Sequence, residues 1–429
     1  MYSTIMEAAP LLKVSDMAEN LIGSEIIKLA GEVKEKISNG EKIYNYTIGD
    51  FDPELFPIPI DLKEEIIKAY QDGHTNYPAA NGMLELRKSV SRYLHTRGGI
   101  EYNENQILIA GGARPLIYAI YQTLLDKNDT VVFPTPSWNN NHYCHITGAK
   151  QVKIEGAPEN NFMPTAKDIK PYISEAKLIA LCSPLNPTGT TFSEKGLEEI
   201  CDLILEENKK RGEQKKPVYL LFDQIYWQLT HGLTIHCDPV SLRPRMKNYT
   251  IYVDGISKAF ASTGVRVGWA FGPQKVIDKM RSICGHIGAW SPKAEQIACA
   301  NYLMKDNSVD AYLAEIKTKI NQRLTGFYDG FSNLKSQGYR VNAIAPQAAM
   351  YLTVKISIQG STTPSGEKLT TAEAVTKYLL NEAKIALVPF YAFGASKKSS
   401  WYRLSVGTAK MEEIPGFFGN LKMALDKLS

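Results

Sequence analysis

The sequence predicts an α/β fold: a large domain around a mostly parallel sheet, joined to a smaller α+β domain. From about residue 60 to 325, short apolar runs alternate with helix-like segments, as in a parallel sheet with helices on both faces. After about residue 325 this alternation stops. The 429 residues are also too many for one ordinary domain.

The N-terminal region predicts one amphipathic helix over residues 24–39. Apolar residues recur there at helical spacing, Ser24 precedes them as an N-cap, and Gly40 ends the pattern. A short strand is expected at 43–48. Three prolines between residues 53 and 59 then indicate a connector between two structural units.

Six apolar runs in the central region are expected to form strands of the sheet: 106–110, 130–133, 178–183, 218–223, 250–254 and 267–271. Helix-like segments lie between them at 82–97, 114–125 and 193–208. In sheets of this kind, ligands bind beyond the carboxyl ends of the strands. Candidate site residues should therefore follow the apolar runs.

The C-terminal region predicts strands at 351–354, 386–389 and 401–406 and helices at 371–383 and 411–428. We expect this unit to pack with the N-terminal helix, so that both termini build the smaller domain. The predicted division is an N-terminal segment at 1–59, a large domain at 60–325 and a small domain at 326–429.

Composition excludes several classes of partner. The net charge of +4 is small for this length and gives no general attraction to nucleic acid or membrane. The six cysteines are dispersed without a CxxC pair, which favours free thiols in a reducing compartment. The sequence has no signal-peptide pattern and no apolar run of about 18 residues, so we expect a cytoplasmic protein. His142 and His145 lack an accompanying acidic or cysteine ligand, and no metal site is expected.

Lys258 is the central candidate for chemistry. It follows the apolar run 250–254 within Gly-Ile-Ser-Lys, and Arg266 comes eight residues later. A lysine in a partly dehydrated site has a depressed pKa, so that its neutral amine can attack a carbonyl and form a Schiff base. The Arg266 guanidinium and the Ser257 hydroxyl would suit a phosphate. A lone lysine at a strand end is usually a surface residue, and the spacing to Arg266 favours the functional interpretation.

Three further segments follow predicted strands. Asn186 lies in Ser-Pro-Leu-Asn-Pro-Thr-Gly, whose residue types also suit a simple turn. Asp223 ends an apolar run, where a carboxylate is costly to bury without a partner; the alternative is a helix N-cap. Gly112 and Ala113 precede a predicted helix, whose free N–H groups can bind an anion, although no nucleotide P-loop is present.

Taken in order, these segments resemble the cofactor site of class I/II pyridoxal-phosphate-dependent aminotransferases, the fold type I or aspartate aminotransferase superfamily. The resemblance covers nearly the whole chain. One departure is Ser262, where the family usually carries an apolar residue. The resemblance implies a seven-stranded-type sheet in an α/β/α sandwich and a homodimer with shared active sites.

The resemblance also implies roles around the cofactor ring. Lys258 would hold pyridoxal 5'-phosphate as a Schiff base and move the substrate's α-proton. Asp223 would pair with the protonated pyridine nitrogen, which keeps the ring an electron sink. Asn186 and Tyr226 would contact the phenolic oxygen. Trp138 would stack on the ring, the alternative being an ordinary core tryptophan.

Phosphate and substrate contacts are implied in the same way. The implied phosphate contacts are Gly112, Ala113, Ser257, Arg266 and, from the other subunit, Tyr77. Arg403, on a predicted strand, would clamp the substrate α-carboxylate together with Asn186, and Gly49 would close over the same group. The alternative for Arg403 is a structural salt bridge.

The implied activity is transfer of an amino group between an L-amino acid and a 2-oxo acid. The same framework also supports a pyridoxal-phosphate-dependent C–S lyase or another reaction of this fold, and a catalytically silent cofactor-binding regulator. Some relatives that use aspartate carry a lysine directly after the glycine pair, where this sequence has Ala113, so dicarboxylate specificity is not implied unless Arg114 or another basic residue substitutes. Arg114 either supplies a charge near the phosphate or substrate or points to solvent, and the second is favoured.

Overall fold

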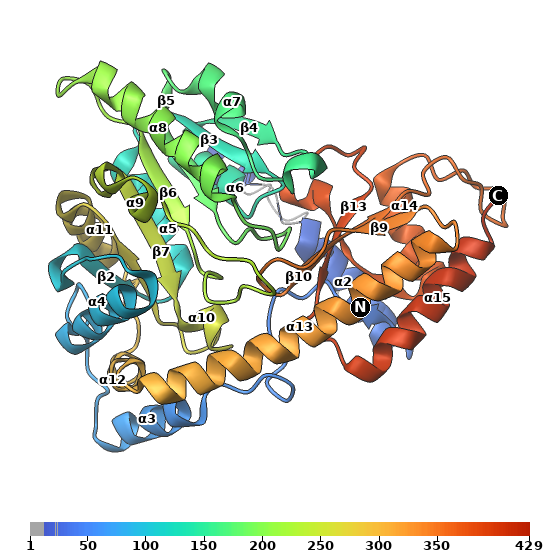
Figure 1. Cartoon of the computed structure of the whole chain (residues 1–429), viewed down its shortest axis with the longest axis horizontal. Coiled ribbons are helices and arrows are strands. Elements are labelled where there is room, and N and C mark those ends of the chain that lie inside the picture. The colour runs from blue at the N-terminus through green and yellow to red at the C-terminus, as the bar shows by residue number, and fades with distance from the viewer. Residues whose placement is uncertain (1–12, 22, 24) are drawn as a thin grey trace, which may run out of the picture.

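The computed structural model describes residues 13–21, 23 and 25–429. Figure 1 shows a larger α/β unit beside a smaller unit that contains the C-terminus, with the long helix α13 (Asp306–Ser336) running from the larger unit into the smaller one. The predicted N-terminal helix is α2 (Glu25–Ser38), preceded by the single turn α1 (Asp16–Glu19). Its predicted N-cap, Ser24, lies outside the described residues.

The larger unit contains a seven-stranded sheet in the order β2-β8-β7-β6-β5-β3-β4. Its strands are β2 (Ile107–Ala110), β3 (Thr130–Thr135), β4 (Lys150–Glu155), β5 (Ala176–Cys182), β6 (Tyr219–Asp223), β7 (Thr250–Gly255) and β8 (Gly268–Phe271). Within this sheet β8 pairs antiparallel with both of its neighbours, and the other pairs are parallel. The predicted mostly parallel α/β sheet is confirmed, and all six apolar runs lie in its strands.

Apolar side chains fill both faces of this sheet. Along β6, Leu220 and Phe222 belong to one core, and Leu221, which points the opposite way, belongs to another. Helices α4 (Leu84–Gly98), α8 (Glu194–Arg211) and α12 (Lys293–Leu303) supply residues to the first core. Helices α5 (Ala113–Leu124), α6 (Asn140–Thr147) and α11 (Gln274–His286) supply the second. The sheet is therefore the middle layer of an α/β/α sandwich.

The smaller unit contains a four-stranded antiparallel sheet in the order β12-β13-β10-β9. Its strands are β9 (Val341–Ala343), β10 (Tyr351–Ile356), β12 (Val388–Pro389) and β13 (Trp401–Ser405), and helices α14 (Ala372–Tyr378) and α15 (Ile414–Asp426) accompany it. The predicted helix 371–383 continues after α14 as a π-helical segment, Leu379–Ala383.

Both ends of the chain meet in this smaller unit. Strand β1 (Tyr44–Asn45) pairs in parallel with β11 (Ile385–Ala386). On α2, Leu29 and Val33 pack against Leu380 and Ala386. The expected strand at 43–48 is thus only two residues long, because its pairing partner is equally short.

Helix α13 takes part in both units. The predicted boundary at residue 325 falls inside this uninterrupted helix of 31 residues. Val309 and Leu313 pack into the core of the large sheet, whereas the buried residues from Ile316 onward pack into the core of the four-stranded sheet. One rigid element therefore carries apolar contacts of both units.

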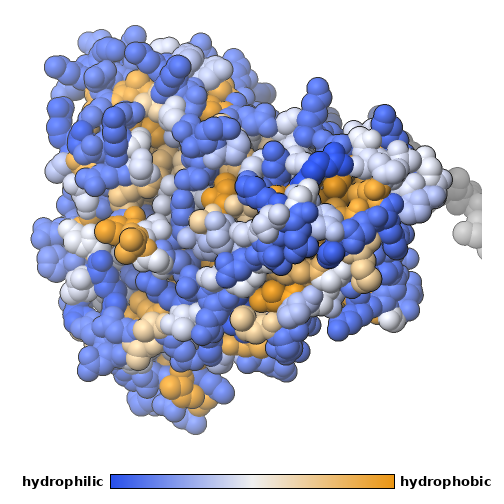
Figure 2. Space-filling model, turned by 45° about the vertical axis from the view of Figure 1, so that its right-hand side comes forward, coloured by the Kyte–Doolittle hydropathy of each residue, from blue (hydrophilic) through white to orange (hydrophobic). Residues whose placement is uncertain are grey.

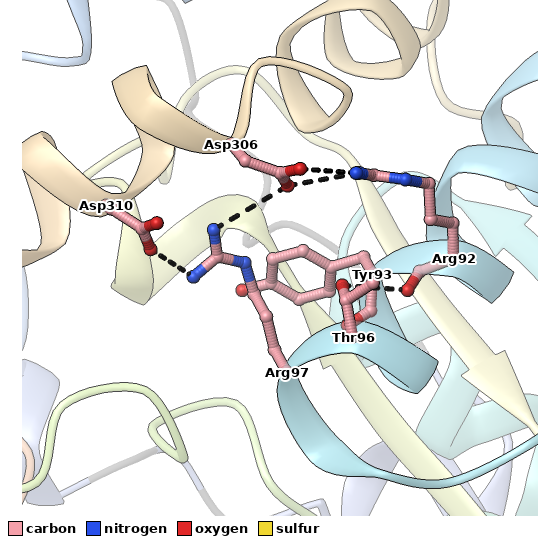
Figure 3. Close-up of polar contacts among 6 residues, drawn as sticks. All are labelled: Arg92, Tyr93, Thr96, Arg97, Asp306 and Asp310. Atoms are coloured by element: carbon pink, nitrogen blue, oxygen red, sulfur yellow. Dashed lines mark hydrogen bonds and ion pairs between the residues drawn. The ribbon is translucent and has the colours of Figure 1, made fainter.

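Ion pairs hold the N-terminal end of α13 to α4. Arg92 pairs with Asp306, and the Arg97 guanidinium lies 2.6 Å from Asp310 and 3.9 Å from Asp306 (Figure 3). Asp306 is the first residue of the helix, where a negative charge is favourable beside the free N–H groups. The long helix is fixed at this end and packed along its length.

Three further observations concern the cysteines, membrane-spanning helices and clusters of metal-binding side chains. All six cysteines are free thiols. Among residues 13–21, 23 and 25–429, no helix is both long and apolar enough to cross a membrane. The same residues contain no cluster of three or more histidine, cysteine, aspartate or glutamate side chains suited to a metal ion.

Candidate active site

The candidate residues meet at one edge of the large sheet. Asp223 ends β6, and Lys258 lies in the short helix α10 (Ile256–Ala259) directly after the neighbouring parallel strand β7. Because β8 is antiparallel, its beginning lies at the same edge, which brings Arg266 there. Gly112 follows β2, which pairs with β8. The sheet topology thus gathers side chains that are far apart in the sequence.

Lys258 is tied to the N-terminal connector. Its Nζ donates a hydrogen bond of 2.7 Å to the backbone oxygen of Gly49 and lies 6.0 Å from the centre of the Tyr226 ring. The residue itself is only partly exposed. The amine therefore lies at the junction of the sheet edge and the chain segment that leads into the large unit.

The surroundings of Lys258 make its amine easy to deprotonate. Burial lowers its pKa to about 8, and the positive charges of Arg403, Arg114 and Arg266 act in the same direction. The Asp50 carboxylate opposes them by favouring the ammonium form. A substantial fraction of the amine is neutral near pH 8, as attack on a carbonyl requires.

Asp223 is a half-buried acid with one hydrogen-bond donor among the described residues. The backbone N–H of Ile225 donates to its Oδ1 at 3.1 Å. Burial raises its pKa to about 6, although this hydrogen bond opposes the shift. No helix directly follows β6, because residues 225–228 form turns, so the helix N-cap alternative is wrong. A cationic partner, such as a protonated ring nitrogen, would favour the ionised form.

An anion cradle lies where α5 begins. Gly112 has φ of +95°, and a Cβ there would clash with the Arg266 guanidinium. A Cβ on Gly268 would meet the Ala113 nitrogen at 2.9 Å. Arg266 donates to the Gly111 oxygen at 2.6 Å and to the Thr263 oxygen at 2.9 Å, which directs its guanidinium at this turn. The start of a 12-residue helix, a cation and close-packed glycines fit a phosphate group.

Arg403 is buried at 1% exposure on β13. It donates to Asn186 Oδ1 at 3.0 Å and to the Thr47 oxygen at 2.6 Å, and it pairs with no carboxylate of the described chain. Its Nε has no protein partner among the described residues. The structural salt bridge considered for it is therefore wrong. A buried guanidinium with spare donors suits a carboxylate ligand.

Aromatic side chains enclose this guanidinium, and the sequence did not indicate them. The Arg403 guanidinium lies 4.7 Å from the Tyr351 ring and 5.0 Å from the Phe393 ring. Tyr351 also shares a hydrogen bond of 2.6 Å with Tyr226, hydroxyl to hydroxyl. A Cβ on Gly49 would lie 3.2 Å from the Tyr351 hydroxyl. In the sequence Tyr351 is only the first residue of an apolar strand, which gives no sign of this role.

The remaining candidates lie around this core. Trp138 is half-buried, with its ring centre 6.0 Å from that of Phe393. Arg114 is exposed, and its guanidinium lies 5.4 Å from the Trp138 ring centre. Ser257 is buried beside Lys258. Tyr77 is 82% exposed, and its ring makes an edge contact with Trp290, so its predicted role depends on a second subunit.

Comparison with known proteins agrees with this arrangement. The family model for aminotransferase class I and II matches residues 41–415. The chain belongs to this family. The aminotransferase is 28% identical to an aspartate aminotransferase of Bacillus subtilis over 402 residues, which are 93% of this chain and 95% of the relative. The family and the enzyme class predicted from the sequence are confirmed.

Solved structures show the same fold for this aminotransferase. The crystal structure of an aspartate aminotransferase from Rhizobium meliloti superposes with a TM-score of 0.89 at 26% identity, covering 97% of this chain and 100% of that one. An aromatic aminotransferase from Pyrococcus horikoshii gives a TM-score of 0.80 at 25% identity, covering 92% and 98%. The similarity extends over both units.

We expect the amine of Lys258 in the cofactor-free aminotransferase to react with aldehydes far below the pH that surface lysines need. With a pKa of about 8, roughly 10% of the Lys258 amine is neutral at pH 7. This fraction is some two orders of magnitude above the neutral fraction of an ordinary lysine. Reductive methylation followed by mass spectrometry measures this pH profile. Asp50→Asn should move the midpoint down and Arg403→Gln should move it up. A midpoint near that of the exposed Lys195 would contradict the assignment.

Proposed function

We propose that this aminotransferase uses pyridoxal phosphate, held by Lys258, to move an amino group between an L-amino acid and a 2-oxo acid. The observation that carries the proposal is the convergence of three groups at one sheet edge. These are a partly buried amine with a lowered pKa, a partly buried carboxyl with a raised pKa and a glycine–guanidinium cradle. Membership of the aminotransferase family supports the same reaction.

The residues around the sheet edge fit this cofactor. Pyridoxal phosphate, when bound, supplies an aldehyde with which amines can condense and a ring that withdraws electrons. Asp223 would face the ring nitrogen, because its buried carboxyl needs a cationic partner to stay ionised. The other proposed contacts are Gly112, Ala113, Ser257 and Arg266 for the phosphate, Asn186 and Tyr226 for the phenolic oxygen, and Trp138 for the face of the ring.

Lys258 would serve as the general base. Its free amine would take the proton from the substrate α-carbon, hold it as an ammonium and return it during the transfer. A pKa of about 8 is close to physiological pH, where a base combines availability with proton affinity. The hydrogen bond to Gly49 holds Nζ at the junction of the two units. Proton movement would thus take place in a partly dehydrated space.

Arg403 would orient the substrate. Its guanidinium is rigidly held by Asn186 and Thr47 and lies between two aromatic rings. A planar guanidinium can bind both oxygens of an α-carboxylate, and its Nε has no protein partner in the described chain. Gly49 leaves room beside it, since a larger side chain would press on Arg403 and Tyr351.

Replacing Lys258 by alanine should abolish both the imine absorbance of the bound cofactor and transamination, with a rate loss of about 10³-fold or more. In the unaltered enzyme, an amino donor should bleach the band, and a 2-oxo acid should restore it. Absorbance and product analysis across the amino acids measure both. Pyruvate or ammonia formed without an acceptor would indicate a C–S lyase instead. A stable band without turnover would indicate a silent regulator.

We propose a dicarboxylic amino acid as one donor. Several relatives are named aspartate aminotransferases. Ala113 carries no charge where relatives that use aspartate have a lysine, but the adjacent Arg114 is a cation whose field reaches Lys258. Its guanidinium over the Trp138 ring lies beside the proposed ring site. The sequence favours a solvent-facing Arg114, and its side chain is exposed; we propose instead that, from this position, it binds the second carboxylate of the donor.

Arg114→Ala should lower kcat/KM for aspartate by about 10- to 100-fold, because a hydrogen bond to a charged group contributes roughly 1.5–3 kcal/mol. The value for phenylalanine should change little, and Arg114→Lys should retain part of the aspartate activity. Steady-state kinetics with both donors and 2-oxoglutarate give the comparison. An equal loss for the two donors would show that Arg114 supports the site and does not select the substrate.

We propose a homodimer with shared active sites. The turn that carries Tyr77 and helix α3 (Ile60–Gln71) are linked to α12, since Lys293 bonds Asn76 and Tyr70 bonds Glu295. Large hydrophobic side chains are exposed on these elements: Ile60, Ile67, Tyr70 and Tyr77. Hydrophobic surface is visible at the lower end of the molecule in Figure 2, where Figure 1 places α3. An apolar face of this kind suits a subunit contact.

Two impaired variants, measured at a cofactor concentration too low to saturate Tyr77→Ala, should complement each other if Tyr77 serves the other subunit. Tyr77→Ala should weaken cofactor binding by about 10- to 100-fold, and Lys258→Ala should be inactive. A one-to-one mixed population should regain about a quarter of the native sites, because half of the dimers are mixed and each has one complete site. Cofactor titration and activity after subunit exchange measure this. No recovery would place Tyr77 outside the shared site.

Two further proposals concern the domain division of the chain and its cellular location. We propose the division into an N-terminal segment at 1–59, a large domain at 60–325 and a small domain at 326–429, with α13 shared between the two cores. We also propose a cytoplasmic location, which six free thiols support.

A further inference from the structure

A second cavity lies away from the proposed cofactor contacts. Its volume is about 300 Å³, and it is lined by the end of α4, the turns after β6, the loop before α9 (Pro239–Leu242) and the middle of α13. None of the residues proposed above to hold cofactor or substrate lines it. Its size is at the lower end of the range for small-molecule sites.

Unpartnered polar groups line this cavity. Gln224 is only 1% exposed, and its Oε1 has no partner among the described residues. The same holds for Gln228 Nε2 and for both ring nitrogens of His236. A buried polar atom without a partner costs roughly 1–3 kcal/mol. Four such atoms in one cavity therefore indicate a polar occupant.

The unpartnered atoms define what that occupant must offer. Burial lowers the pKa of His236 to about 4, so its imidazole is neutral and has one donor and one acceptor. Gln228 Nε2 is a donor, and Gln224 Oε1 is an acceptor. A matching molecule must therefore both accept and donate hydrogen bonds.

The cavity wall contains one cation without a protein partner among the described residues. Lys317 on α13 is half-buried and forms no hydrogen bond or ion pair within the described part of the chain. Arg97 also lines the cavity, but Asp310 already binds its guanidinium (Figure 3). Asp238 is engaged as well, since its Oδ1 accepts from two backbone N–H groups of α9 and from the Tyr252 hydroxyl. These donors are neutral and do not cancel the charge of a carboxylate, so Lys317 and Asp238 give the wall charges of both signs, and Lys317 is the cation that can attract a carboxylate.

One wall of the cavity is aromatic and rigid. The Trp227 ring centre lies 6.0 Å from that of His236 and 5.9 Å from that of Tyr93. The Trp227 indole N–H donates to Asp254 at 2.9 Å, which fixes the ring. Such a wall suits the carbon skeleton of a small molecule, and it places an intrinsic fluorophore beside the ligand.

We propose that this cavity binds a small organic carboxylate that also carries an N–H or O–H donor, as amino acids and 2-hydroxy acids do. Lys317 and Gln228 would bind the carboxylate, and Gln224 Oε1 would accept from the donor. The apolar part would lie against Trp227. The site is separate from the proposed substrate position at Arg403, so it exists whether or not the proposed reaction is correct.

Three matched probes test the proposal on the holoenzyme: L-alanine, L-lactate and propionate, which differ only in the amine, hydroxyl or hydrogen at carbon 2. Calorimetry and tryptophan fluorescence report binding. We expect saturable binding of alanine, lactate or both, at least about tenfold tighter than propionate. The preference between the first two distinguishes an amino acid site from a hydroxy acid site. Equal binding of all three, or no saturable binding, would overturn the proposal.

Variants assign the signal to this cavity. Lys317→Ala should weaken binding about 10- to 100-fold, whereas Lys319→Ala, two residues away and paired with Glu315, should not. Gln228→Met, which keeps the size of the side chain but removes the amide, should also weaken it. Arg403→Ala should leave the signal intact. Binding lost in the Arg403 variant and retained in both cavity variants would place it at the substrate site and refute the proposal.

Discussion

The burial of one amine at the edge of a parallel sheet is the constraint on which the site depends. Lys258 can lose its proton near neutral pH because the fold removes water from it and places arginines around it. That environment comes from several parts of the chain. The large sheet supplies Asp223 and Arg266, the four-stranded sheet supplies Arg403, and the N-terminal connector supplies the Gly49 oxygen that holds Nζ. Neither unit contains a complete site by itself.

Positively charged side chains outnumber the acidic ones at the site. Lys258, Arg266, Arg403 and Arg114 lie within electrostatic range of one another, and the nearby acids are Asp223 and Asp50. Burial weakens the tendency of Asp223 to ionise, so the local excess is positive. Such a cluster is costly without anions, and a phosphate together with a substrate carboxylate would supply them. The electrostatics of this protein thus match the chemistry of its family.

Helix α13 links the positions of the two units, because it packs into the cores of both. Its first residues are held to α4 by ion pairs, and its side chains enter first one apolar core and then the other. A shift of the four-stranded sheet would carry Arg403 with it and change its distance from Lys258. The same helix contributes Lys317 to the second cavity, whose wall includes Trp227 and Gln224, close in sequence to Asp223. The cavity and the active site are therefore built on common elements.

The sequence by itself determined the α/β class, the positions of the apolar strands, and the order of the segments that resemble the family, because each depends on local hydrophobic pattern or residue spacing. It did not show strand β4, whose exposed edge residues are mostly polar, or the continuity of α13 across residue 325. Only the tertiary structure placed Tyr351 against Tyr226 and Arg403 against Asn186, pairs separated by 125 and 217 residues. These contacts depend on how two sheets pack together, and no local pattern encodes that distance. The same reason hid the polar cavity, since its lining comes from three separate stretches of the chain, at 97–100, 224–238 and 317.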